Sequence, residues 1–184
     1  TGLETKFTAL GAELRAVAGP EGVAIEGYAS LFGVVDQGGD VVAAGAYRRS
    51  LAAIAGRGGR VKMLWQHDPS EPIGVWDEVR EDARGLWVKG RLLPEIARAR
   101  EAATLIAAGA IDGLSIGYRT VRADRDNAGK RNLREVELWE VSLVAFPMLA
   151  EARVGAKVDA AIAAFLKDLA VQLKNARREL GMRR

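Results

Sequence analysis

Cysteine is absent from this sequence, and histidine occurs once, at position 67. The chain therefore cannot form disulfides, bind a metal through thiolates or use a cysteine nucleophile. A single histidine also excludes a metal site built from a cluster of histidines. Any acyl-transfer chemistry would have to use serine, threonine or lysine.

Long hydrophobic runs are missing as well. No apolar run reaches the roughly 18 residues that span a bilayer. Residues 1–7 lack the basic start and apolar block of a signal peptide. We therefore expect no membrane association, and a cytoplasmic location fits the absence of cysteine.

Positive charge is concentrated at the C-terminus. The formal net charge of the chain is +3. Residues 173–184 carry five basic residues and one acidic residue, so the net positive charge of this segment exceeds that of the whole chain. The basic balance belongs to this tail, so it does not predict a sequence-specific nucleic-acid binder.

The composition and the periodicity predict an α+β domain with a mostly antiparallel sheet. The chain has 184 residues, 49% of them hydrophobic and 28% charged, which is typical of a globular protein with one substantial core. Period-two patterns predict strands, and apolar residues at helical spacing predict helices. We expect strands at 10–17, 23–32, 60–66, 73–80, 86–93, 114–121 and 132–146, and helices at 43–55, 96–110 and 158–180.

Three local features refine this pattern. Pro69 and Pro72 lie among acidic residues, so 67–72 is predicted to be a turn, and 123–130 a polar loop. The four tryptophans fall in predicted strands and are expected to pack in the interior. In the last helix the apolar residues follow an 11-residue repeat, which predicts a fairly straight amphipathic helix.

Residues 113–117 read G-x-S-x-G around Ser115, the sequence form of a nucleophile elbow. In an α/β-hydrolase this elbow follows a strand and precedes a helix, and the triad order is serine, acid, histidine. Here a predicted helix precedes Ser115, a strand follows it, and the histidine comes first. A triad would therefore stand on a different scaffold; the alternative is a serine that simply begins a strand.

His67 and Glu140 are the other candidates for chemistry. His67 ends a predicted strand, where it is either a general base or a structural residue. Glu140 lies in an apolar strand and needs a partner if it is buried. It is either the carboxylate that orients His67 or an exposed or ion-paired residue, and Ser142 shares its face of the strand. The rival carboxylates for the orienting role are Asp68, Glu135 and Glu137.

Four segments together resemble the prohead maturation protease family of tailed phages, including the versions found in prophages and in bacterial gene transfer agents. Their order and spacing carry the resemblance, which covers about residues 3–155. The segments are 27–32 followed by Asp36 and Asp40, 64–68 followed by 72–74, 109–118, and 140–144 followed by Pro147.

The resemblance implies a serine endopeptidase related to the herpesvirus assemblins. It implies an antiparallel β-barrel of assemblin type with peripheral helices over residues 1–155, and it leaves 156–184 as a separate C-terminal amphipathic basic helix. Ser115 would be the nucleophile, His67 the base and Glu140 the third member. Assemblins have a second histidine in that third place, so the single histidine fits the phage version.

The resemblance also implies the surroundings of the reaction. By analogy, backbone amides near Met148 and Leu149 would form the oxyanion hole, and no cofactor or metal would be needed. Such proteases act inside the assembling procapsid in the host bacterial cytoplasm. They cleave the scaffold, the scaffolding segment of the major capsid protein, and finally themselves. Assemblins become active by dimerising, so the resemblance suggests a homodimer.

Two other functions stay open at this point. One is a catalytically silent assembly module that binds scaffold or capsid protein through the terminal helix. The other is an unrelated esterase that uses Ser115.

Overall fold

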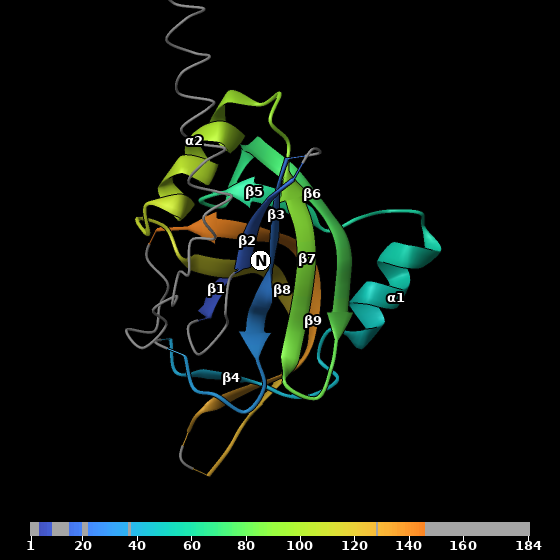
Figure 1. Cartoon of the computed structure of the whole chain (residues 1–184). Helices are drawn as coiled ribbons and strands as arrows, with labels where there is room; N and C mark the ends of the chain where they lie inside the picture. The colour runs from blue at the N-terminus through green and yellow to red at the C-terminus, as the bar shows by residue number, and fades with distance from the viewer. Residues whose placement is uncertain (1–3, 9–14, 20–21, 37, 128, 146–184) are drawn as a thin grey trace, which may run out of the picture.

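The computed structural model describes residues 4–8, 15–19, 22–36, 38–127 and 129–145. Nine strands and two helices lie in these residues (Figure 1). The strands are β1 (Glu4–Thr8), β2 (Arg15–Gly19), β3 (Gly22–Leu31), β4 (Asp40–Val42), β5 (Lys62–Trp65), β6 (Asp68–Glu81), β7 (Gly85–Leu92), β8 (Gly113–Arg125) and β9 (Arg131–Val144). The helices are α1 (Arg48–Gly56) and α2 (Ala97–Ala107).

All nine strands belong to one sheet that curls into a half-barrel. Its order is β1-β8-β9-β5-β6-β7-β3-β2, with β4 pairing to β9 outside this path. The pairs are antiparallel except β4–β9 and β5–β9, which are parallel. The end strands β1 and β2 do not pair with each other in the part of the chain described here. The expectation of a mostly antiparallel sheet with two helices is therefore confirmed. The sheet is a half-barrel, whereas a β-barrel was expected.

Strand β9 is the centre of this sheet. β8 pairs with it along its whole length on one side, from Arg131 to Val144. On the other side β4 covers its first residues and β5 covers residues 140–143. Between them, Val136 N–H donates to Ala46 O (3.0 Å) and Leu138 N–H to Ser50 Oγ (2.9 Å), so α1 and the loop before it satisfy the backbone there.

The two helices lie at different sides of the sheet (Figure 1). The loop before α1 is held by Glu81 of β6, whose carboxylate accepts hydrogen bonds from Gly45 N (2.6 Å) and Tyr47 N (3.1 Å). In α2, Ala99, Ala103 and Ile106 are buried, as their helical spacing predicts. No helix in the residues described is long and apolar enough to cross a membrane.

The sequence placed several boundaries incorrectly. β6 starts at Asp68, where a turn was predicted, because register irregularities against β5 accommodate the two prolines. β8 continues to Arg125 into the predicted loop, since it pairs with β9 as far as Arg131. β1 and β4 were not predicted at all. The third predicted helix, and with it the separate segment 156–184, lies outside the described residues.

The interior placement of the tryptophans is correct for Trp76, which is 3% exposed, and wrong for Trp139, which is 44% exposed. Trp65 and Trp87 are half-buried. Trp139 breaks the expectation because it points out of β9, opposite to the buried Leu138 and Glu140 on either side of it.

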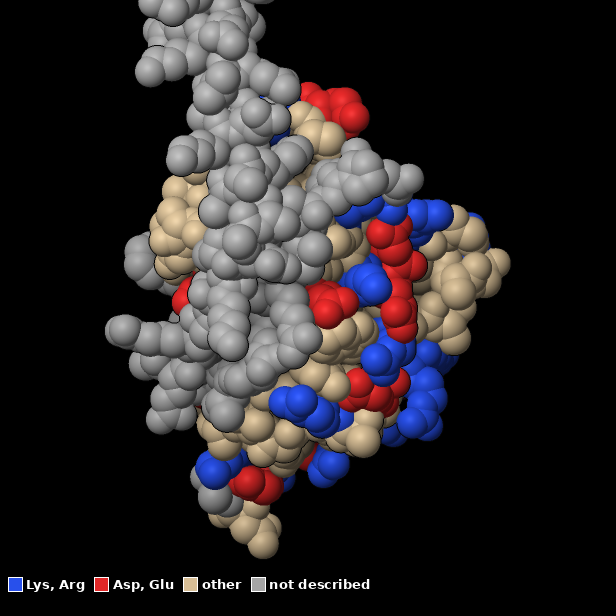
Figure 2. Space-filling model, viewed as in Figure 1, with Lys and Arg blue, Asp and Glu red and all other residues tan. Residues whose placement is uncertain are grey.

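The outer face of β3, β6 and β7 carries alternating charges. Figure 2 shows basic and acidic side chains side by side on this part of the surface. Lys89 lies 3.9 Å from Glu26, and Arg91 lies 2.5 Å from Asp77. Such mixing of signs is typical of a solvated face.

Candidate active site

Glu140 is the charged group at the centre of the candidate site. It lies in β9 and is 3% exposed, although the strand around it is apolar. A buried carboxylate needs hydrogen-bond donors. Glu140 Oε2 accepts a bond from Ser142 Oγ (2.5 Å), and Oε1 lies 2.6 Å from His67 Nδ1. The sequence indicated that Glu140 needs a partner if it is buried, and the structure provides two, His67 and Ser142.

His67 reaches Glu140 through an unusual turn. β5 ends at Trp65, and the next two residues, Gln66 and His67, have φ of 52° and 63° before β6 begins. Non-glycine residues rarely adopt this left-handed region. Two hydrogen bonds to β9 hold the turn: Gln66 N donates to Leu143 O (2.9 Å) and His67 N to Ser142 Oγ (3.1 Å).

The contact with Glu140 fixes how His67 can act. An ionised carboxylate only accepts hydrogen bonds, so Nδ1 of a neutral His67 carries the proton. The lone pair then resides on Nε2, which is the atom a general base uses. Nε2 is buried, and the side chain as a whole is 13% exposed.

Ser115 is brought to the same place by β8. It is the third residue of that strand and fully buried. Its direct partner across the β8–β9 pair is Ser142. Directly opposed residues have Cβ atoms about 4.5–5.5 Å apart and point to the same face. Ser115 therefore lies beside the serine that binds both His67 and Glu140.

Gly117 explains part of the G-x-S-x-G motif that the sequence left without a role. It lies opposite Glu140 in the β8–β9 pair. A Cβ at this position would be 2.1 Å from Glu140 Oε1, so the carboxylate occupies the space that a side chain would take. Its spacing of two from Ser115, on the same face of the strand, was the available signal.

The rival carboxylates lie elsewhere. Asp68 is exposed, and its Oδ1 accepts bonds from the backbone and hydroxyl of Ser70. The Ser70 hydroxyl, followed by the Ser70 backbone, lowers the pKa of Asp68. Glu135 pairs with Arg49 at 3.2 Å and Glu137 with Arg119 at 2.5 Å, both on the surface. Of the four acids considered, Glu140 is the one in contact with His67.

Two other expectations concern the remainder of the site. Met148 and Leu149, the candidates for the oxyanion hole, lie outside the described residues. Within the described ranges no group of three histidine, aspartate or glutamate side chains has the arrangement of a metal site.

The sequence profile of the caudovirus prohead serine protease family matches residues 11–167. The chain belongs to this family. The match takes in β2 to β9 and all of His67, Ser115, Glu140 and Ser142. Membership makes the chain a relative of serine proteases that act in prohead maturation, and the family resemblance seen in the sequence is confirmed.

Two known proteins illustrate the range of the likeness. The prohead protease of Enterobacteria phage HK97 is 32% identical over 141 residues, which are 75% of this chain and 61% of that protein. The chain therefore spans less than two thirds of this relative's length. The structure of the bacteriophage T4 capsid assembly protease superposes with a TM-score of 0.66 at 16% identity, covering 79% of this chain and 98% of that one. At that identity the second likeness concerns the fold.

Proposed function

We propose that this chain is a serine endopeptidase of phage-like capsid maturation, in which Ser115, His67 and Glu140 form a catalytic triad. The observation that carries the proposal is the buried carboxylate of Glu140, 2.6 Å from Nδ1 of the chain's only histidine. The position of Ser115 opposite Ser142 adds a buried hydroxyl at the same point. Membership in a family of serine proteases supports this chemistry.

The steps follow from the tautomer of His67. Nε2 removes the proton from Ser115 Oγ as that oxygen attacks a peptide carbonyl, and it then passes the proton to the leaving amine. Glu140 keeps the ring oriented and stabilises the imidazolium that forms. Water then attacks the acyl-enzyme by the same route. Backbone amides near Met148 and Leu149 remain the predicted donors to the oxyanion.

The substrates follow from the family. We expect cleavage of the scaffold, of the scaffolding segment of the major capsid protein, and of the chain itself, inside the procapsid in the host bacterial cytoplasm. The names of the relatives, a prohead protease and a capsid assembly protease, support a role at this stage of assembly. A homodimer and a prophage or gene-transfer-agent source remain part of the proposal.

Co-expression with the matching capsid precursor tests this proposal. The wild-type chain should shorten the precursor and itself, whereas Ser115→Ala should leave both intact for as long as the gel is followed. Loss of the nucleophile costs most of the rate enhancement of a serine protease, about 10⁶-fold in kcat. Ser70→Ala, a change at an exposed serine, is the matched control and should process normally.

The outcomes separate the alternatives. Equal processing by the wild type and Ser115→Ala would contradict the triad and leave an assembly module. Turnover of a small ester that Ser115→Ala abolishes, without any peptide cleavage, would indicate an esterase instead.

A further inference from the structure

In the described part of the chain, Ser142 is hydrogen-bonded to both His67 and Glu140, and the proposed triad gives it no function. It is fully buried in β9, two residues after Glu140. Its Oγ accepts a hydrogen bond from His67 N (3.1 Å) and donates one to Glu140 Oε2 (2.5 Å). A buried hydroxyl with both an acceptor and a donor role filled has a fixed orientation.

The direction of these bonds matters. A backbone N–H can only donate, so the contact with His67 uses a lone pair of Ser142 Oγ. The hydroxyl proton is then left for the carboxylate, which can only accept. Because that proton is committed to Glu140, Ser142 is poorly placed to act as a nucleophile, and Ser115 opposite it is the serine left for that role.

The bond to Glu140 fixes the plane of the carboxylate. With His67 Nδ1 as its single partner, the carboxylate could rotate about its terminal torsion, which is broad. A second bond on the other oxygen removes this freedom. Hydrogen bonds between a ligating or catalytic group and its neighbours commonly set its orientation in this way.

The hydrogen bond from His67 N to Ser142 stabilises a strained part of the backbone. Two successive non-glycine residues with positive φ store backbone strain. Such a conformation persists only when its surroundings hold it. Ser142 Oγ and Leu143 O are the two acceptors on β9 that bind the backbone N–H groups of this turn.

We propose that Ser142 is a positioning residue of this site: its single hydroxyl locks the left-handed His67 turn and the plane of the Glu140 carboxylate relative to each other. The proposal rests on the triad proposed above for its kinetic consequence, and on the structure alone for its effect on His67. Ser142 does not contact the reacting atoms in this scheme. It acts through His67, which moves the proton, and through Glu140, which orients His67.

The test measures two quantities on the full chain. The first is inactivation by a fluorophosphonate, a probe that reacts with an activated serine, resolved into the maximal rate and the half-saturating concentration. The second is the proton resonance of His67 Nδ1–H, which needs no assignment because the chain has one histidine. The resonance reports the His67–Glu140 bond whether or not the protein is a protease.

Ser142→Ala should lower the maximal inactivation rate roughly 10- to 100-fold, the usual effect of losing a hydrogen bond to a charged group. The half-saturating concentration should stay within about twofold, because Ser142 is fully buried and affects the chemical step through His67 and Glu140. The Nδ1–H resonance should broaden or move upfield as the carboxylate loses its alignment. Ser142→Thr retains the hydroxyl and should restore both readouts, whereas Ser142→Cys keeps the size with a weak donor and should behave like Ser142→Ala.

Ser50→Ala is the matched control. Its Oγ also accepts a hydrogen bond from a backbone N–H of β9, at Leu138, and it is also buried, but it is not in the site. It should leave the resonance and the rate unchanged, so a general loosening of β9 is distinguished from a local one. Circular dichroism confirms that each variant is folded at the temperature of the assay.

The result that overturns the inference is a folded Ser142→Ala protein with the wild-type resonance. A Ser142→Thr protein that is folded yet as impaired as Ser142→Ala would overturn it as well, since the hydroxyl would then not be the cause. If the wild-type chain does not react with the probe, the proposed protease function fails, and the resonance still decides the role of Ser142.

Discussion

Gly117 faces Glu140 across the β8–β9 pair, and its missing side chain is what makes room for the carboxylate. An alanine Cβ would be 2.1 Å from Oε1, a separation that no contact tolerates. The carboxylate, rather than the two strands, is the group that can move. We therefore expect Gly117→Ala to fold but to lower the rate of probe inactivation by roughly 100-fold, the effect of a displacement of about 1 Å.

Gly56→Ala is the control for this change. Gly56 ends α1, has ordinary φ, and has nothing within 4 Å of the added Cβ. Its rate should match that of the wild type, and its stability should stay equal or rise slightly. A Gly117→Ala protein with an unchanged rate would mean that Glu140 can leave this position without consequence, which would argue against its role.

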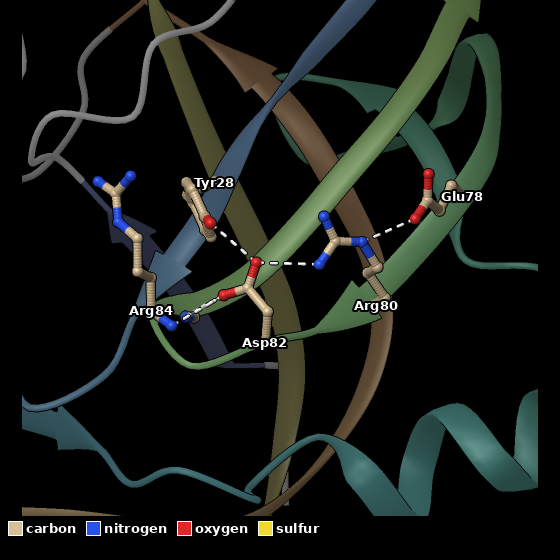
Figure 3. Close-up of polar contacts among 6 residues, drawn as sticks. Tyr28, Glu78, Arg80, Asp82 and Arg84 are labelled. Carbon is tan, nitrogen blue, oxygen red and sulfur yellow. Dashed lines mark hydrogen bonds and ion pairs between the residues drawn. The ribbon is translucent and has the colours of Figure 1, made fainter.

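At the scale of the element, the β6–β7 turn is stabilised by one side chain. Asp82 Oδ1 accepts hydrogen bonds from Arg84 N (2.8 Å) and Gly85 N (3.2 Å), and Oδ2 accepts them from Tyr28 OH (2.8 Å) and Arg80 (3.0 Å) (Figure 3). Asp82→Ala removes all four. We expect a loss of about 1–2 kcal/mol in the free energy of unfolding, seen as a melting temperature lower by about 2–8 °C.

The pH dependence of this effect has a defined sign. Burial raises the pKa of Asp82, but the hydrogen bonds from Tyr28, Arg84 and Gly85 outweigh it and hold this pKa below its ordinary value. The stabilisation is then fully present above the unfolded-state value of about 3.9 and is lost as the pH falls through the folded-state value. The difference between wild type and Asp82→Ala should be largest near pH 7 and shrink below about pH 4.

Asp77→Ala, in β6 shortly before this turn, is the comparison. Asp77 pairs with Arg91 at the surface, so its loss should change the stability by less than about 1 kcal/mol. Equal effects of the two substitutions would show that the backbone hydrogen bonds of Asp82 contribute nothing beyond a surface ion pair.

The same scale shows what the sequence could predict. β9 and α2 carry clear periodicity, and both were placed within a few residues. β1 and β4 were missed, and each pairs with a strand that is distant in the sequence, β8 and β9, so no local pattern shows its partner. β6 was cut short because prolines argue against a strand, whereas local register shifts accommodate them here.

The sequence named the residues of the candidate site but not their geometry, and their catalytic roles stay a prediction. Ser115, His67 and Glu140 followed from the family resemblance and from the rarity of histidine. The left-handed turn at Gln66 and His67 depends on two acceptors in a strand more than 70 residues away. The space that Gly117 leaves for the Glu140 carboxylate depends on the pairing register of β8 and β9, which no local sequence pattern shows.

At the scale of the whole molecule, the site is an assembly of three distant segments. His67 follows β5, Ser115 lies in β8 and Glu140 in β9, and these strands are adjacent only in the folded sheet (Figure 1). The geometry therefore depends on how the sheet curls. Trp76 of β6 bears on this curl, because its buried indole Nε1–H donates to Val141 O of β9 (3.2 Å) across the intervening β5.

Trp76→Phe tests whether this bond holds the half-barrel together. It removes the donor and part of the ring from a site that is 3% exposed. We expect the free energy of unfolding to fall by about 1–3 kcal/mol and the melting temperature by roughly 3–8 °C. Well below the melting temperature, the rate of probe inactivation should stay within about twofold of the wild type, because Trp76 touches none of the reacting groups.

Trp139→Phe makes the matching change at an exposed tryptophan of β9 and should alter the stability by less than about 0.5 kcal/mol. If Trp76→Phe melts as Trp139→Phe does, the indole bond adds nothing and apolar packing alone sets the curl. If it melts like the wild type yet reacts slowly, the bond adjusts the register of β9 at Glu140 instead of stabilising the sheet. The combination of melting temperature and rate therefore separates a global role for Trp76 from a local one.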